Sequence, residues 1–223
     1  MPYGEKSKTD LIKFSNKIFK FFEEKEIKAV VMACNTTSSN VYDDLKNNYN
    51  FRIYPIIQSV TGILANLPIE RLGVFATQAT INSHAYSYGV NKNNKKIEVI
   101  EIACPEWVKI VESKTENKAA SIEQIKSKMD EIKRFNPQKI VLGCTHYPYL
   151  LTQLSKYAPE DTFINPAESF VNFIKKDLEK LNLLSDKTTR GSEKIYVSSN
   201  PEQFKSAASM FYEIAQTPEL IKL

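Results

Sequence analysis

Residues 140–150, IVLGCTHYPYL, begin with an apolar run that ends at Gly143 and is followed at once by a thiol, a hydroxyl and an imidazole. Residues 29–39, AVVMACNTTSS, have the same order: an apolar run, a small residue, and then Cys34 with polar neighbours. Short runs rich in Val, Ile and Leu are typical of strands buried in a parallel sheet. The sequence therefore predicts two buried strands that each end at a cysteine.

Strand and helix patterns alternate along the whole chain. We expect strands at residues 29–33, 52–57, 72–76, 97–102, 139–142, 162–164 and 194–198. We expect helices at residues 37–48, 80–88, 105–113, 121–135, 148–157, 167–181 and 201–214, and a first helix, capped by Thr9 or Asp10, that runs to about residue 26. This alternation is typical of an α/β fold with mainly parallel sheets.

The composition argues against several classes of partner. The 223 residues carry 30 basic and 26 acidic side chains, interspersed along the predicted helices, which indicates a solvated surface and no nucleic-acid partner. No apolar run reaches the roughly 18 residues of a membrane span, and the first ten residues lack the apolar core of a signal peptide. Three cysteines, an odd number, do not fit a disulfide framework. We expect a cytoplasmic protein with no membrane partner.

The positions of Cys34 and Cys144 favour reactive thiols, although either cysteine alone also fits a buried core position. Ligands of open α/β sheets bind beyond the carboxyl ends of the strands, where both cysteines are expected. A following helix N-terminus would lower the pKa of each thiol. Several neighbouring side chains are suited to bind an anion such as a carboxylate: Asn35, Thr36, Thr37 and Thr145.

The remaining cysteine and the two histidines differ in what they indicate. His146 stands two residues after Cys144. It fits either a core or capping position, or a pair with the thiol or a substrate carboxylate. Cys104 lacks a polar continuation and precedes a proline, and His84 lies among small residues of a predicted helix. We expect a structural position for Cys104 and a structural or surface position for His84.

Two thiols on opposite sides of a substrate carbon suggest racemisation. One base removes a proton from one face and the other returns a proton to the opposite face, without a cofactor. The chain has six glycines and no dinucleotide or P-loop fingerprint, and its cysteines are not spaced as zinc ligands. We therefore expect no metal, pyridoxal phosphate or nucleotide cofactor.

The two cysteine motifs, ACNTTSS and GCTHYPYL, resemble the active-site motifs of bacterial glutamate racemases, in the aspartate/glutamate racemase superfamily. Further segments resemble the same family: PYGEKS at 2–7, GVFATQATINSHAY at 73–86, ACPEWVKIVE at 103–112 and YVSSNPEQF at 196–204. Related aspartate racemases usually carry an acidic residue at the position of His146. The sequence CTH therefore points to glutamate.

The resemblance implies two pseudo-symmetric α/β domains with the active site in the cleft between them. Residues 1–57 and 170–223 would form one domain, and residues 58–169 the other. Cys34 and Cys144 would be the two catalytic bases, with His146 and Glu112 assisting Cys144. The residues implied to bind substrate are Tyr3, Gly4, Asn35, Thr36, Thr145 and His146. The implied product is D-glutamate for peptidoglycan synthesis and cell shape, and a homodimer is one assembly compatible with the resemblance.

The N-terminal end departs from the family. About 40 residues of the family precede the segment that PYGEKS resembles, whereas Pro2 here follows Met1. They include a turn reading roughly FDSGxGG, whose Asp would assist Cys34 and whose Ser would bind substrate. The resemblance thus predicts that this chain is poorly stable and racemises glutamate weakly or not at all. The alternatives are a racemase of aspartate or another amino acid, or a non-catalytic paralogue that binds an amino acid or a protein partner.

Overall fold

The computed structural model describes residues 3–189, 191–209 and 211–223. By their internal contacts, the residues form two compact units, Met1–Asn182 and Leu183–Leu223. Within the described ranges, none of the helices has the length and apolar character of a membrane span.

The first unit alternates strands and helices, as the sequence predicts. Its strands are β1 (Ala29–Met32), β2 (Arg52–Pro55), β3 (Arg71–Ala76), β4 (Glu98–Ala103), β5 (Lys139–Gly143) and β6 (Phe163–Ile164). Its α-helices are α1 (Lys8–Glu23), α2 (Asn35–Leu45), α3 (Ile56–Leu64), α4 (Gln78–Asn82), α5 (Ala85–Asn93), α6 (Glu106–Glu112), α7 (Ala119–Lys133), α8 (Leu151–Leu154) and α9 (Pro166–Lys180). Short 3-10 helices are η1 (Tyr3–Glu5), η2 (Tyr147–Leu150) and η3 (Glu160–Thr162).

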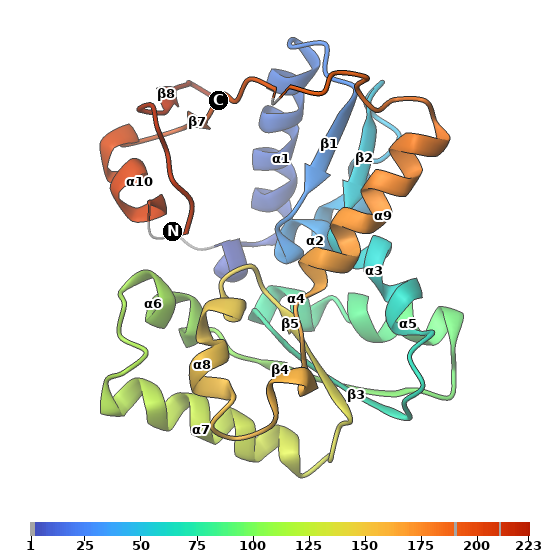
Figure 1. Ribbon diagram of the computed structural model, residues 1–223, viewed down its shortest axis with the longest axis vertical. Helices are drawn as coiled ribbons and strands as arrows, with labels where there is room; N and C mark the ends of the chain where they lie inside the picture. Colours follow the sequence, from blue (N-terminus) through green and yellow to red (C-terminus); the bar gives the residue numbers. More distant parts are fainter. Residues whose placement is uncertain (1–2, 190, 210) are drawn as a thin grey trace. The chain divides into compact units, whose positions relative to one another are not determined.

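Strands β1 and β2 pair in parallel and form what we call the small sheet. Figure 1 shows the two strands between α1 and α9. Val30 and Met32 of β1 are buried in a core with side chains of α1 and α2. On β2, the Tyr54 hydroxyl donates to Asp177 of α9 at 2.7 Å, and the same carboxylate pairs with Arg52. The small sheet is therefore held by apolar packing on α1 and α2 and by a polar cluster on α9.

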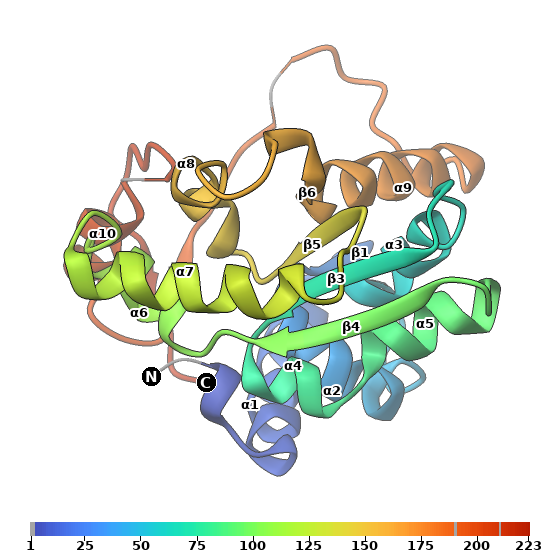
Figure 2. The ribbon, with the colours of Figure 1, turned by 90° about the horizontal axis from the view of Figure 1, so that it is seen from below.

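The large sheet has the order β4-β3-β5-β6, with every neighbouring pair parallel. Alternate side chains of a strand face opposite sides of the sheet. Phe75 packs into the core with α6 and α7, whereas Leu72 and Val74 pack into the core with α3 and α5. Figure 2 shows α7 running across this sheet, and a Cβ at Gly73 would lie 2.5 Å from the Ile132 side chain of α7. Helices thus cover both faces, as the continuous apolar runs indicate.

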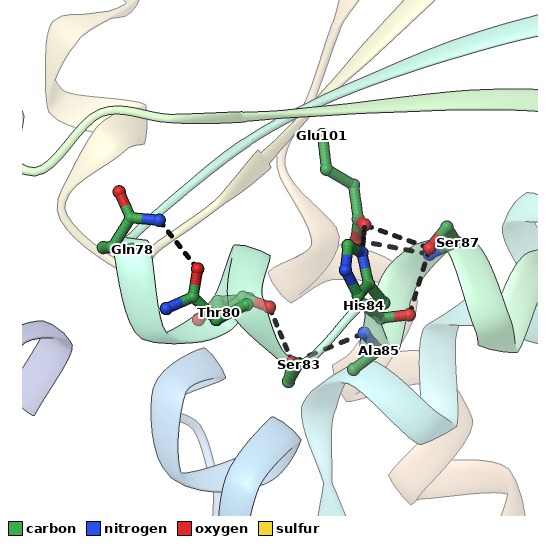
Figure 3. A network of polar contacts seen from close by, with 8 residues as sticks. Gln78, Thr80, Ser83, His84, Ala85, Ser87 and Glu101 are labelled. Atoms are coloured by element: carbon green, nitrogen blue, oxygen red, sulfur yellow. Dashed lines mark hydrogen bonds and ion pairs between the residues drawn. The ribbon is translucent and has the colours of Figure 1, made fainter. Parts of the chain in front are cut away.

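Two helices, α4 and α5, replace the single helix predicted at residues 80–88. The break falls at His84, whose φ of 52° is left-handed. The Glu101 carboxylate accepts hydrogen bonds from the Ser87 hydroxyl at 3.0 Å and the Ser87 N–H at 3.3 Å, and it lies 3.1 Å from His84 Nδ1 (Figure 3). These contacts fix the N-terminus of α5 to β4. His84 therefore has a structural position, in line with the prediction.

The second unit contains a short parallel pair, β7 (Tyr196–Val197) with β8 (Glu219–Leu220), and helix α10 (Pro201–Ala208). The Tyr212 hydroxyl donates to Glu193 at 2.6 Å. The strand predicted at 194–198 and the helix predicted at 201–214 are both shorter than expected. Within the latter range, residue 210 lies outside the described residues.

Two local predictions are wrong. No helix was predicted at α3, and its first residues were assigned to the preceding strand. Its buried residues include positions 56, 57, 60, 61 and 64, which recur at the spacing of one helical face, so the pattern of an amphipathic helix was present in the sequence and was missed. The first helix is capped by Ser7, whose Oγ accepts the Asp10 N–H at 3.1 Å, and not by Thr9 or Asp10. The division into residues 1–57 with 170–223 and residues 58–169 stays a prediction.

Candidate active site

Strands β1 and β5 end at one cavity of about 280 Å³ in the first unit. Cys144 follows β5 directly, and Cys34 follows β1 after one intervening residue. The residues that line the cavity are Tyr3, Gly4, Cys34, Asn35, Thr36, Thr77, Val108, Glu112, Cys144, Thr145 and His146. Every catalytic and substrate-binding residue implied by the resemblance is among them, whereas Thr37, which was also expected to bind an anion, does not line the cavity. Small-molecule sites usually span about 300–1,000 Å³, so this cavity favours a ligand of amino-acid size over a nucleotide.

Thr77 and Val108 line the cavity and were not predicted. The Thr77 hydroxyl lies 2.9 Å from the Thr36 hydroxyl, so it joins α4 to α2. Gly4 approaches so closely that a Cβ on it would lie 2.7 Å from Thr77 Cβ. A signal for Thr77 was present in the sequence, because this polar residue directly follows an apolar strand at the same sheet edge as Cys144. Val108 has no polar atom in its side chain and gave no such signal.

The N-terminus of α2 lies at the cavity, with Cys34 as N-cap and Asn35 as its first residue. The first N–H groups of a helix lack intrahelical partners and lie at the positive end of the helix dipole, which suits an anion. The Asn35 side chain is buried. Its Oδ1 accepts a hydrogen bond from the Tyr86 hydroxyl at 2.7 Å, and its Nδ2 has no partner among the described residues. Asn35 lines the cavity, and its buried Nδ2 keeps a donor that the described residues leave unused.

Cys34 is partly exposed. Its carbonyl accepts hydrogen bonds from the Thr37 hydroxyl at 3.0 Å and the Ser38 N–H at 2.9 Å. In the described ranges, no side chain forms a hydrogen bond with its sulfur. Tyr3 lies nearby: burial raises the pKa of its phenol, and a charge on Cys34 raises it further. The immediate surroundings of Cys34 are therefore polar, but no carboxylate or imidazole of the described chain is bound to this thiol.

Cys144 is buried and stands at the start of a chain of polar contacts. Its Sγ lies 3.7 Å from His146 Nδ1, and His146 Nε2 lies 3.2 Å from Glu112 Oε1. Glu112 is the last residue of α6, so the contact joins two segments that are distant in sequence. An imidazole between a thiol and a carboxylate is placed to accept or return a proton at the thiol.

The prediction of a lowered thiol pKa is wrong for Cys144. Burial raises the pKa of this thiol to about 12, and nearby charges on Cys34 and Glu112 act in the same direction. Backbone N–H groups of His146 and Tyr147 act in the opposite direction and do not compensate. The chain continues into the 3-10 helix η2 rather than into the α-helix predicted at residue 148, so no long helix dipole offsets the desolvation. The thiol is therefore protonated at neutral pH.

Cys104 has the structural position predicted for it. It is buried in the core with Trp107, and burial raises the pKa of its thiol. Its carbonyl accepts a hydrogen bond from the Tyr147 hydroxyl at 2.7 Å. Cys104 does not line the cavity that Cys34 and Cys144 share.

The sequence of the chain matches those of a known protein family. The sequence model of the Asp/Glu/Hydantoin racemase family matches residues 1–174. The chain belongs to this family. It is 32% identical over 214 residues to glutamate racemase 2 of Caldanaerobacter subterraneus subsp. tengcongensis, covering 94% of this chain and 79% of that protein. It is 31% identical over 212 residues to a glutamate racemase of Thermoanaerobacter sp., with coverages of 94% and 79%.

Solved racemase structures share the fold. The crystal structure of glutamate racemase from Francisella tularensis subsp. tularensis SCHU S4, in complex with D-glutamate, matches with a TM-score of 0.90 and 30% identity. The match covers 100% of this chain and 84% of that one. The predicted α/β fold with parallel sheets is confirmed.

Proposed function

We propose that the protein is a glutamate racemase that interconverts L- and D-glutamate with two cysteine bases and no cofactor. One observation carries the proposal: Cys34 and Cys144, from the ends of strands in different sheets, line one cavity of amino-acid size. The similarity to glutamate racemases, one of them solved with D-glutamate, supports glutamate as the substrate.

The proposed reaction breaks one C–H bond and forms another. One cysteine, as thiolate, takes the α-proton, and the electron pair of the broken bond passes into the substrate carboxylate. The other cysteine, as thiol, gives its proton to the opposite face of Cα, and the electron pair returns to form the new bond. The two sulfurs thereby exchange protonation states. The raised pKa of Cys144 suits it to the proton-donor step, with Cys34 as the base in that direction and the roles exchanged in the other.

The cavity wall offers groups for both the substrate and the charge that develops on it. The N-terminus of α2 and the Asn35 amide present N–H donors, and Thr36 and Thr145 present hydroxyls. Donors placed where negative charge develops stabilise the transition state. In the proposed mechanism, His146 and Glu112 accept the Cys144 proton when this thiol must act as base. Tyr3 and Gly4 complete the wall beside Cys34.

A chiral assay of several amino acids tests the proposal. Purified protein is incubated separately with L-glutamate, L-aspartate, L-glutamine and L-alanine, and each enantiomer is measured by chiral chromatography. We expect D-glutamate to accumulate slowly toward an equal mixture, in line with the weak activity predicted from the sequence, and at the same rate after dialysis against a chelator. The Cys34→Ala/Cys144→Ala double variant, purified identically, controls for contaminating enzymes.

Each other outcome identifies an alternative. Faster conversion of aspartate or another amino acid would assign the chain to a different racemase. Glutamate binding without conversion of any amino acid would favour a non-catalytic binding protein. In the proposed role, the product is D-glutamate for peptidoglycan synthesis in the cytoplasm, as the resemblance of the sequence motifs implies.

A further inference from the structure

Tyr86 of α5 contacts both cysteine-bearing segments. Its hydroxyl donates to Oδ1 of Asn35, the residue after Cys34, at 2.7 Å. Its ring lies against Gly143, the residue before Cys144, where a Cβ would come within 3.0 Å of Tyr86 Cε2. Tyr86 itself is fully buried. One side chain therefore joins two segments that are more than a hundred positions apart in the sequence.

The hydrogen bond decides which end of the Asn35 amide is left without a partner in the described part of the chain. An amide carries an acceptor at one end and two donors at the other. Burial raises the pKa of Tyr86 far above its ordinary value, so its hydroxyl stays protonated. A protonated hydroxyl without an acceptor would be costly at a buried site, so it orients the Asn35 carbonyl toward itself. The Nδ2 group is left without a partner among the described residues, and Asn35 lines the cavity.

The ring supports the other segment by close packing. A Cβ at position 143 would lie 2.9 Å from the Phe75 carbonyl oxygen as well as 3.0 Å from the Tyr86 ring. Only a glycine leaves the space that the ring occupies on this side of β5. The ring edge therefore forms the support behind the chain as it turns from Gly143 to Cys144.

We propose that Tyr86 is a positioning residue for substrate binding: it presents the Asn35 amide N–H as a donor into the cavity and backs the segment that carries Cys144. The inference deepens the proposed function and rests on it for the identity of the ligand. Tyr86 does not line the cavity, so it acts through Asn35 and Gly143 rather than by touching the substrate.

Tyr86→Phe removes one oxygen and keeps the ring. We expect the KM for glutamate to rise about 10- to 100-fold, the range given by losing an oriented hydrogen bond, while kcat changes by less than about threefold. Tyr54→Phe is the matched control, because Tyr54 is also buried and also donates at 2.7 Å, but to Asp177 and outside the cavity. An equal KM in the two variants would overturn the proposal.

A double-mutant cycle separates positioning from general loosening. If Tyr86 acts through the amide, Tyr86→Phe should leave the KM of an Asn35→Ala protein unchanged within about twofold, because contacting residues couple and independent ones add. Full additivity of the two changes would show that the tyrosine hydroxyl serves only the stability of the fold.

A third measurement does not depend on racemisation. The side-chain amide signal of Asn35 in a ¹⁵N-labelled protein is assigned by its loss in Asn35→Ala. We expect this side-chain amide to have a high NMR order parameter in the wild-type protein and in Tyr54→Phe, and a lower order parameter in Tyr86→Phe. Equal order in all three proteins would reject the positioning role even if the enzyme is active. If the wild-type protein shows no turnover but the amide loses order only in Tyr86→Phe, the proposed function is rejected and the positioning role is retained.

Discussion

The segments around Cys34 and Cys144 share a sequence pattern and differ in structure. Cys34 is partly exposed and caps α2, a helix of 11 residues. Cys144 is buried at the end of β5, which pairs with strands on both sides, and is followed by a short 3-10 helix. His146 lies within contact distance of the Cys144 sulfur. Two similar sequences therefore hold two chemically different thiols.

The difference between the two segments shows that the end of a strand determines the position of a thiol. Its acidity is determined by how deeply the thiol is buried and by the charged and polar groups around it. At Cys144, desolvation raises the thiol pKa more than the adjacent backbone N–H groups lower it. A thiol with a pKa of about 12 requires a group that accepts its proton before it acts as a base. The contact from His146 to Glu112 supplies a candidate on that side of the cavity.

The largest expected effect is common to both segments. In the proposed two-base reaction, Cys34→Ala and Cys144→Ala each remove one proton transfer, so each should lower kcat/KM for glutamate by about 10²–10⁴-fold or more. Cys104→Ala is the control, since this thiol lies in the core and outside the cavity, and it should retain activity within about threefold. Chiral chromatography of the product measures all three. Turnover near the wild-type level in either of the first two variants would remove that cysteine from the mechanism.

The second largest effect on activity is expected to act only through Cys144. His146→Asn should lower kcat/KM about 10- to 100-fold, and Glu112→Gln less, because loss of a proton relay acts on Cys144 alone. The two enantiomers have equal free energy in water, so kcat/KM must fall equally in both directions. The asymmetry should appear in the isotope effect with α-deuterated glutamate, which should rise more for the enantiomer whose proton Cys144 removes. An equal rise for both enantiomers would show that the two thiols share the relay.

Thiol alkylation compares the segments directly. Cys34→Ala/Cys104→Ala leaves only Cys144, and Cys104→Ala/Cys144→Ala leaves only Cys34. At pH 8 we expect iodoacetamide to modify Cys144 at least about tenfold more slowly, because it is buried and its raised pKa keeps the thiol neutral. The thiolate fraction grows about tenfold per pH unit below the pKa, so the Cys144 rate should climb steadily from pH 7.5 to 9.5. Mass spectrometry follows the reaction, and equal rates at pH 8 would contradict the expected protection of Cys144.

The sequence predicted the position of the site better than its energetics. Strand ends are visible as apolar runs, and ligands of open α/β sheets bind beyond the carboxyl ends of the strands, so Cys34, Asn35 and Cys144 were found. Glu112 was found only through the family resemblance, since a carboxylate at a helix end usually has no site role. The order of strands in the large sheet could not be predicted, because it depends on contacts between distant segments.

The errors have physical causes of the same kind. The break at His84 is accompanied by a contact with Glu101, a residue of β4 that is distant in the sequence. The pKa of Cys144 depends on how completely the folded chain excludes water, which no local pattern reports. Tertiary surroundings decide each of these features.

The smallest predicted effect compares the two sheets in stability. The large sheet is covered by helices on both faces, whereas the small sheet is tied to α9 through Asp177, which accepts from Tyr54 and pairs with Arg52. Asp177→Asn keeps the shape of the side chain and removes its charge. It should lower the free energy of unfolding at pH 7 by about 1–2 kcal/mol, which is less than for a fully buried ion pair because Arg52 is partly exposed.

The pH dependence of this effect follows from the pKa of Asp177, which the Tyr54 hydrogen bond, followed by Arg52, lowers. A lowered pKa means that this stabilisation is present above the unfolded-state pKa of about 3.9 and is lost as pH falls through the folded-state value. The difference in Tm between the wild type and Asp177→Asn should therefore shrink below pH 4, whereas Asp130→Asn, on an exposed surface pair of α7, should change Tm little at any pH. A Tm difference at Asp177 that is independent of pH would show that the carboxylate charge does not hold α9 to the small sheet.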